Sequence, residues 1–470
     1  MKKNKSIFTL ILLFIISNIA FSQNVKIEGR VNKPNALVRL LTYNDMLTYE
    51  QTLVCETQSD DEGVFLLEAN VVDITVSQVA VNLERVDLLI KPDASYELEI
   101  IIPEQKKDAS YFERESPTLK IINISDDELY SQYHVSNMII DDFLYENFNQ
   151  IYRNRRLSLL DTLDAAIQRN IPEIKSEFVK DNIRYRKAAI QMLVNNDNGK
   201  KVINQYFNKQ NVLFSSPAYM NLFHELFVNY LASRQFSPSD LRYMLYQDYD
   251  RFMTYLKEKD VFLAENQNLA EIIVAYNLKR MFYEFQDDRK AILDKLKYIG
   301  QNAKNQKTKE IVNDMLKQIN RLSFNSDAPD FSLRDKNGNV VGLADFKENM
   351  LLIQFVNKVS SMTDYQFELL KDFSNQWQDT IQIVTIATKE SFEDFEKLFE
   401  EKNYRWKLLN LENEILLLEK YQIKTYPDYV IIGKNGKIGM SPAPSPEQYL
   451  DFHVRRLYKY YKKYLFFHKI

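Results

Sequence analysis

The sequence predicts a multidomain α+β protein with an N-terminal β-sandwich at residues 23–105, a helical middle domain at 126–324 and a C-terminal α/β domain at 326–470. Three observations support this division. The chain has 470 residues, whereas single domains usually have about 100–200. Short alternating apolar runs separated by turn residues fill the first region, and apolar residues three and four apart fill the second. In the third region, strand-like and helix-like stretches alternate.

Residues 1–22 have the three parts of a secretory signal peptide. Three lysines lie within the first five residues, an apolar run begins at Ile7, and Ala20-Phe21-Ser22 supplies small residues before a cleavage point. An uncleaved anchor helix is the alternative, but the run is short for a membrane span. We therefore expect a mature chain that begins at Gln23, has no transmembrane span, and is secreted across the inner membrane into the periplasm or cell envelope.

Composition excludes several kinds of site. The formal net charge is −4, which gives no basic field for nucleic acid. None of the 9 glycines falls in a G-x-G-x-x-G or G-x-x-x-x-G-K-[ST] arrangement, so a phosphate-binding glycine loop is not expected. The single cysteine, Cys55, excludes an intramolecular disulfide, a Cys-x-x-Cys pair and a multi-cysteine zinc site. No cofactor and no metal are predicted.

Strand-like runs make up the first region. Turn residues separate them, notably Lys33-Pro34-Asn35, Asp60-Asp61-Glu62-Gly63 and Pro92-Asp93. The runs are Val25 to Ile27, Val38 to Leu40, Val64 to Leu67, Val76 to Val81, Val86 to Ile90 and Tyr96 to Ile102. Short strands at this spacing predict a small β-sandwich, in which Cys55 is a half-buried, unreactive side chain.

Helical periodicity dominates the middle region. Ser237-Pro238-Ser239-Asp240 predicts a helix start, because it places a cap residue before a proline at the first helical position. The many Tyr and Phe residues allow a ligand-binding groove as one hypothesis. Aromatic residues at helical spacing are more often core residues, so burial is the default prediction.

The C-terminal region predicts a mixed sheet with helices. Its expected elements are a strand at 350–356, a helix at 363–377, a strand at 381–387, helices at 391–402 and about 412–421, a strand from 428 with a hairpin at 434–437, and a last helix from Ser445-Pro446. Strands that alternate with helices and then end in a hairpin are typical of a layered α/β domain.

This order, together with Asp327-Ala328-Pro329-Asp330-Phe331, the turn around Gly338 and Tyr426-Pro427 before a strand, resembles the TlpA/redoxin branch of the thioredoxin-like superfamily, which is related to AhpC/TSA domains. The resemblance covers residues 326–470. The N-terminal region is similar to the β-sandwich found ahead of such domains in secreted Bacteroidetes proteins.

The resemblance implies thiol–disulfide exchange by two cysteines at the start of the helix that follows the first buried strand. Aligning Phe355 with the family's phenylalanine puts Ser360 and Thr363 at those positions, in Ser360-Ser361-Met362-Thr363. A hydroxyl cannot form a disulfide, and it needs an activating base to act as a nucleophile. We therefore expect these residues to cap the helix and the protein not to be an enzyme.

Pro427 matches the family's cis-proline, which presents backbone to an extended substrate segment. Tyr426 and Pro427 are therefore the candidate peptide-binding edge, and strand addition there requires no thiol.

The leading interpretation is a secreted, non-enzymatic binding or assembly factor of the cell envelope, with an envelope protein or peptide as its partner. A thiol–disulfide oxidoreductase or antioxidant of the TlpA/AhpC-TSA type is the alternative. A ligand-binding module centred on the helical domain is the second alternative.

Overall fold

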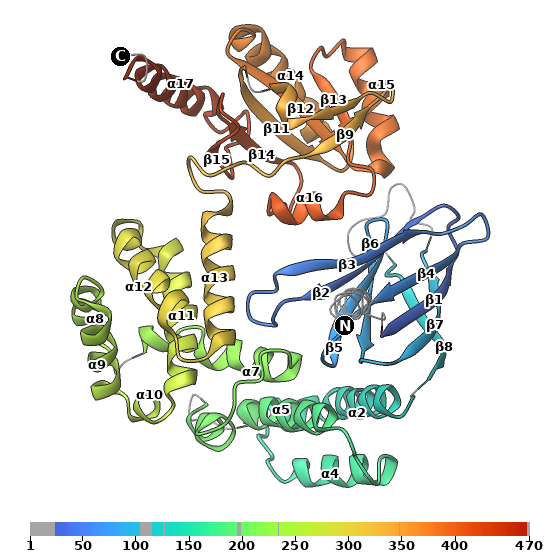
Figure 1. The fold of residues 1–470 in the computed structure, drawn as a ribbon, viewed down its shortest axis with the longest axis vertical. Coiled ribbons are helices and arrows are strands. Elements are labelled where there is room, and N and C mark those ends of the chain that lie inside the picture. The colour runs from blue at the N-terminus through green and yellow to red at the C-terminus, as the bar shows by residue number, and fades with distance from the viewer. Residues whose placement is uncertain are drawn as a thin grey trace, which may run out of the picture. The chain divides into compact units, whose positions relative to one another are not determined.

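The computed structural model describes residues 24–103, 115–125, 127–194, 199–233, 235–346 and 348–467. The predicted signal peptide at residues 1–22 lies outside these residues. The chain divides into two compact units, Met1–Asp314 and Met315–Ile470, coloured blue to yellow and yellow to red in Figure 1. The boundary falls within one helix, α13 (Gln306–Arg321).

Eight strands form two four-stranded sheets at the start of the first unit, with the orders β4-β1-β7-β8 and β3-β2-β5-β6. Side chains along β1 alternate between buried and exposed, so Val25 and Ile27 point inward. They join Val38 and Leu40 of the other sheet in one hydrophobic core. The strands are β1 (Val25–Val31), β2 (Leu37–Tyr43), β3 (Gln51–Gln58), β4 (Val64–Ala69), β5 (Thr75–Val81), β6 (Glu84–Ile90), β7 (Ser95–Ile101) and β8 (Thr118–Ile124).

Two strands of this region were not expected from the sequence, and both are edge strands. β3 lies at the edge of one sheet, and β8 lies at the edge of the other, beyond the predicted boundary at residue 105. Side chains on β3 are at most half-buried, and Ile122 of β8 is 49% exposed. An edge strand covers less apolar surface than a central strand, so its inward and outward residues differ less in type.

Helices account for the rest of the first unit. Ser237 caps α8, since its side chain accepts from the backbone N–H of Asp240, as the sequence predicts. The large aromatic residues Phe207, Tyr219, Phe223 and Phe227 are fully buried and form core contacts. The helices are α2 (Asp127–Glu146), α3 (Phe148–Tyr152), α4 (Leu159–Asn170), α5 (Glu177–Val194), α6 (Lys200–Val202), η2 (Ile203–Phe207), α7 (Pro217–Phe227), η3 (Tyr230–Ala232), α8 (Pro238–Leu245), α9 (Tyr249–Lys259), α10 (Val261–Glu265), α11 (Gln267–Glu284), η4 (Gln286–Asp288), α12 (Arg289–Asn302) and α13.

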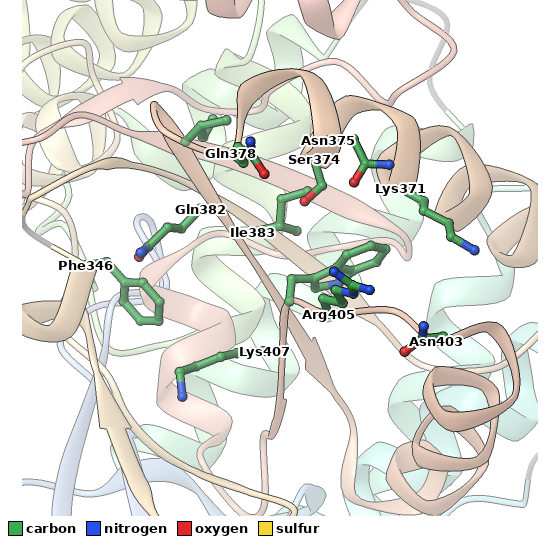
Figure 2. A pocket seen from close by; sticks show the side chains of 12 residues that line it. Phe346, Lys371, Ser374, Asn375, Gln378, Gln382, Ile383, Asn403, Arg405 and Lys407 are labelled. Carbon is green, nitrogen blue, oxygen red and sulfur yellow. The ribbon is translucent and has the colours of Figure 1, made fainter.

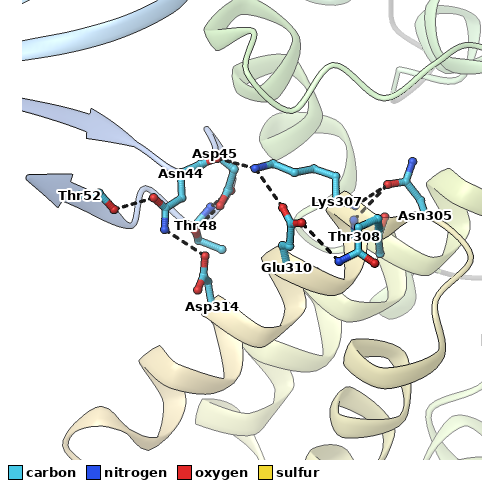
Figure 3. Close-up of polar contacts among 10 residues, drawn as sticks. Asn44, Asp45, Thr48, Thr52, Asn305, Lys307, Thr308, Glu310 and Asp314 are labelled. Atoms are coloured by element: carbon cyan, nitrogen blue, oxygen red, sulfur yellow. Dashed lines mark hydrogen bonds and ion pairs between the residues drawn. The ribbon is translucent and has the colours of Figure 1, made fainter. Parts of the chain in front are cut away.

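The turn between β2 and β3 contacts the helical part of the same unit. Asn44 donates to the carboxylate of Asp314 at 3.2 Å, and Lys307 donates to the Asn44 carbonyl at 2.9 Å (Figure 3). The buried carboxylate of Asp45 holds the turn by accepting from the backbone N–H groups of Leu47 and Thr48. The sheets and helices of the first unit are therefore joined by directional contacts.

The second unit contains a seven-stranded mixed sheet with the order β10-β9-β13-β12-β11-β14-β15. β11 and β12 are parallel and central, and their predicted bounds are confirmed. The elements are β9 (Ser332–Asp335), β10 (Val340–Gly342), η5 (Leu343–Phe346), β11 (Met350–Val356), α14 (Ser361–Trp377), β12 (Ile381–Ala387), η6 (Lys389–Ser391), α15 (Phe392–Lys402), β13 (Lys407–Asn410), α16 (Ile415–Lys420), β14 (Asp428–Ile432), β15 (Ile438–Met440) and α17 (Leu450–Phe467).

Several features of this unit differ from the prediction; α14, for example, begins at Ser361 and not at residue 363. The last helix begins at Leu450 and not at Ser445-Pro446, because Tyr449 has a φ of 63°, outside the right-handed helical region. β13 was not predicted as a strand. It has only four residues, too few to show a clear alternation.

Candidate functional site

Ser360 and Thr363 lie where β11 passes into α14. All seven residues of β11 are buried, which fixes this strand at the centre of the sheet. A short exposed loop follows, and Ser360 is the N-cap residue of α14, with the extended backbone that this position requires. The predicted register therefore places both residues at the start of the helix.

Both hydroxyls take part in capping the helix. The Ser360 backbone N–H donates to Oγ1 of Thr363 at 2.7 Å, and the Thr363 backbone N–H donates to Oγ of Ser360 at 3.2 Å. This reciprocal pair is a capping box. Among the described residues, the hydroxyls hydrogen-bond each other and backbone groups, and no imidazole is hydrogen-bonded to either of them. The expectation that these residues cap the helix is confirmed.

Tyr426 and Pro427 lie at the same end of the sheet. They precede β14, which pairs antiparallel with β11 and sets Asp428 opposite Phe355. Because β11 and β14 are adjacent strands, the segment that enters β14 and the loop that follows β11 lie at the same end of neighbouring strands. The Tyr426–Pro427 peptide bond is cis. Thr425 is exposed, and it makes no hydrogen bond with another described residue.

Three exposed apolar residues accompany this site, and the sequence analysis missed them. Val359, Met362 and Tyr365 are 40%, 55% and 54% exposed. They are three residues apart: Val359 lies in the loop before α14, and Met362 and Tyr365 lie in its first two turns, where they are exposed while Thr363 and Phe367 are buried. That spacing was a usable signal, since it places apolar residues on a second face of an otherwise amphipathic helix. We call these residues the apolar cluster.

Asp428 adds a titratable group beside this segment. Its half-buried carboxyl accepts from the backbone N–H of Tyr429 at 2.8 Å. Burial raises the pKa of Asp428, and the hydrogen bond from Tyr429 opposes that effect only in part. The folded state therefore binds the proton of this carboxyl more tightly than the unfolded chain does.

A chain of side-chain hydrogen bonds crosses the buried core behind the site. Successive donor–acceptor distances are 3.0, 3.1, 2.9, 2.8 and 2.8 Å. The chain runs, in order, through Trp406, Thr385, Gln354, Tyr429, Gln366 and Glu447. Its four middle side chains are buried, and each polar group there has a partner. We call this series the polar relay; it ties α14 to three strands of the sheet.

The only thiol in the sequence lies elsewhere. Cys55 is a free, half-buried cysteine on β3 of the first unit. Burial raises its pKa, although a hydrogen bond from the backbone of Glu68 works in the other direction. A raised pKa lowers the fraction of thiolate, which is the reactive form.

The described residues contain neither a metal-binding cluster nor a membrane-spanning helix. Within those residues, no group of three or more His, Cys, Asp or Glu side chains is placed to hold a metal ion. No helix in the same part of the chain is long and apolar enough to cross a bilayer.

Comparisons with known proteins identify the C-terminal region. Residues 324–441 match the AhpC/TSA family. No curated protein matches the chain. The thioredoxin domain of a thiol-disulfide oxidoreductase from Bacteroides vulgatus shares 25% identity, with a TM-score of 0.27 over 29% of this chain and 99% of that one.

Two further solved structures are similar. A thiol:disulfide interchange protein from a Bacteroides species shares 27% identity over 27% of this chain and 86% of its own, with a TM-score of 0.25. The exposed lipoprotein thioredoxin Etrx1 from Streptococcus pneumoniae shares 21% identity over 27% of this chain and 99% of its own, with a TM-score of 0.24. The C-terminal part of the chain, residues 324–441, thus matches an AhpC/TSA domain, and this part of the sequence contains no cysteine.

Proposed function

We propose that this protein is a secreted, redox-inactive binding factor of the cell envelope that holds an extended segment of a partner protein at the start of α14, beside Tyr426 and Pro427. Its N-terminal sheets act as a β-sandwich module ahead of the binding domain. The observation that carries this proposal is the apolar cluster, because it lies where the family's redox residues would stand.

The chemistry of the site supports binding over catalysis. Ser360 and Thr363 are both used to cap α14. The one sulfur nucleophile in the sequence, Cys55, is on β3 and has a raised pKa. Thiol–disulfide exchange requires a thiolate and a second cysteine to resolve the mixed disulfide. The oxidoreductase alternative is supported by the family match and by no group in the site.

The surface provides what an extended segment needs. Thr425 offers unpaired backbone groups at an exposed position, which can hydrogen-bond a strand laid alongside. Met362 and Tyr365 offer apolar area to a side chain of that strand, and methionine adapts to different shapes. The backbone N–H groups of Ser361 and Met362, which the capping box leaves unused, favour a carboxylate or carbonyl of the partner.

A photo-crosslinking experiment in cells tests the proposal. A photoreactive phenylalanine derivative replaces Tyr365 in the full chain, and partners are identified by mass spectrometry. Tyr449 is the matched control, because it is a tyrosine of the same unit that is 80% exposed and lies outside the apolar cluster. We expect a discrete set of envelope proteins crosslinked from position 365 and not from 449. The same products from both positions would contradict the proposal.

An insulin-reduction assay separates the proposal from the oxidoreductase alternative. We expect no turnover by the purified mature chain above background. Turnover that Cys55→Ser abolishes would establish the alternative and overturn the proposal.

N-terminal sequencing tests the location. Protein recovered from the envelope fraction should begin at Gln23. Recovery of the intact leader in a soluble cytoplasmic fraction would contradict secretion.

A further inference from the structure

A cleft of about 490 Å³ opens where β12 and β13 begin, at the other end of the parallel strands from Ser360. The cleft arises because β13 is shorter than β12. β13 pairs with β12 only from Val384 onward, so residues 381–383 of β12 have no strand beside them on that side. The last two turns of α14 and the chain that leads into β13 line the gap (Figure 2).

Three cations line the cleft, and none of the twelve described residues that line it is acidic. Figure 2 shows Lys371 and Lys407 on either side of Arg405. The ammonium of Lys371 is held in place, since it donates to the Lys402 carbonyl at 3.0 Å and lies over the ring of Tyr404. Lys407 also attracts the carboxylate of Asp335. Arg405 is exposed and has no hydrogen bond or ion pair with a described residue.

Four side-chain amides surround these cations. They are exposed, and none of them makes a hydrogen bond with another described residue. They belong to Asn375, Gln378, Gln382 and Asn403. An amide both donates and accepts, so such a group suits the hydroxyls of a ligand, which also do both.

An aromatic wall completes the cleft. Trp406 is half-buried, and its ring stacks on Tyr404 with centroids 4.8 Å apart. Its indole N–H donates to Thr385 and so begins the polar relay. The indole is thus fixed before any ligand arrives, and a wall that is already ordered loses less conformational freedom on binding.

We propose that this cleft binds an acidic saccharide, with the carboxylate or sulfate of the sugar at Arg405 and Lys407 and its hydroxyls at the amides. Cations supply charge-assisted hydrogen bonds to the acidic group, and guanidinium does so in a bidentate manner. The amides favour a sugar over a bare inorganic anion, because a sugar has hydroxyls with which they can hydrogen-bond. The volume lies within the usual range of ligand sites, roughly 300–1,000 Å³. This cleft is separate from the proposed peptide site. The saccharide proposal therefore does not depend on the peptide-binding proposal.

Titration calorimetry on the mature full chain provides the test. The probe is digalacturonic acid, with lactose as a neutral disaccharide and sodium sulfate as a bare anion. We expect binding of the acidic disaccharide, affinity for lactose and sulfate lower by about tenfold or more, and weakening by salt. Equal affinity for sulfate would overturn the saccharide assignment, and so would an absence of binding to digalacturonic acid.

Matched variants locate the binding. Arg405→Gln should lower the affinity for digalacturonic acid about tenfold, while Lys397→Gln, which changes an exposed lysine on α15, should leave it unchanged. Asn375→Ala should weaken binding of the sugar, while Gln376→Ala, the exposed neighbour that does not line the cleft, should not. All four positions are exposed, so the variants should fold. The proposal would be overturned if Arg405→Gln changed the affinity for digalacturonic acid no more than Lys397→Gln, and Asn375→Ala no more than Gln376→Ala.

Discussion

The two ends of the C-terminal sheet carry different surfaces. Where β11 ends, the helix cap uses the two hydroxyls, and three exposed apolar side chains lie beside it: Val359, Met362 and Tyr365. Where β12 and β13 begin, the exposed side chains are cations and amides, and the gap comes from a strand that starts late. A thioredoxin-like sheet can therefore offer two chemically distinct surfaces, because one depends on which residues cap a helix and the other on where strands pair.

The polar relay runs through the buried core of this domain, and breaking it should have the largest effect. Tyr429→Phe leaves the Gln354 amide and the Gln366 carbonyl without their buried partner, so we expect a loss of about 2 kcal/mol in the free energy of unfolding. Urea denaturation followed by tryptophan fluorescence measures it. Tyr449→Phe, at an exposed tyrosine, is the control, and equal stabilities of the two variants would show that the relay contributes nothing.

Removing the helix cap should have an intermediate effect at one end only. Ser360→Ala removes the acceptor for the Thr363 backbone N–H, so we expect a loss of about 1 kcal/mol in unfolding free energy. Ser361→Ala changes the adjacent exposed serine within the helix and should have little effect. Affinity for digalacturonic acid should stay the same in both variants, since the cleft lies at the other end. A change in that affinity would contradict the separation of the two surfaces.

Asp428 should give a smaller, pH-dependent effect. Burial raises the pKa of its carboxyl in the folded state, so the stability that the neutral form provides is lost as the pH rises from the ordinary carboxyl range through the raised value. Asp428→Asn should therefore be more stable than the original protein at neutral pH, with the difference shrinking toward about pH 4. Urea denaturation between these pH values measures it. Asp379→Asn, at an exposed carboxyl, is the comparison, and a pH-independent difference for Asp428→Asn would argue against the burial effect.

The apolar cluster should matter least for stability. Met362→Ser combined with Tyr365→Ser changes two exposed side chains, so we expect the free energy of unfolding to shift by less than about 0.5 kcal/mol. The crosslinks trapped from a probe at Val359 should nevertheless disappear in this variant. A large loss of stability would mean that these side chains are part of the fold and not a free binding surface.

Much of the fold followed from local patterns. The bounds of β11 and β12 and the helix caps at Ser237 and Ser360 agree with the sequence, because each depends on residues close together in the chain. The missed strands β3 and β8 are edges, and β13 is short, so none of them shows a strong alternation. The cleft was missed for the same reason as β13. It exists only because β13 does not extend alongside residues 381–383 of β12.

The sequence by itself determined what the site lacks. With one cysteine at position 55 and hydroxyl residues at 360 and 363, no disulfide can form at the start of α14, whatever the fold. Only the tertiary structure decided what the site has in its place. Whether Met362 is exposed, whether Thr425 lies at the same end of the sheet as the helix start, and whether Arg405 lines a cleft all depend on strand register and packing between residues distant in the chain.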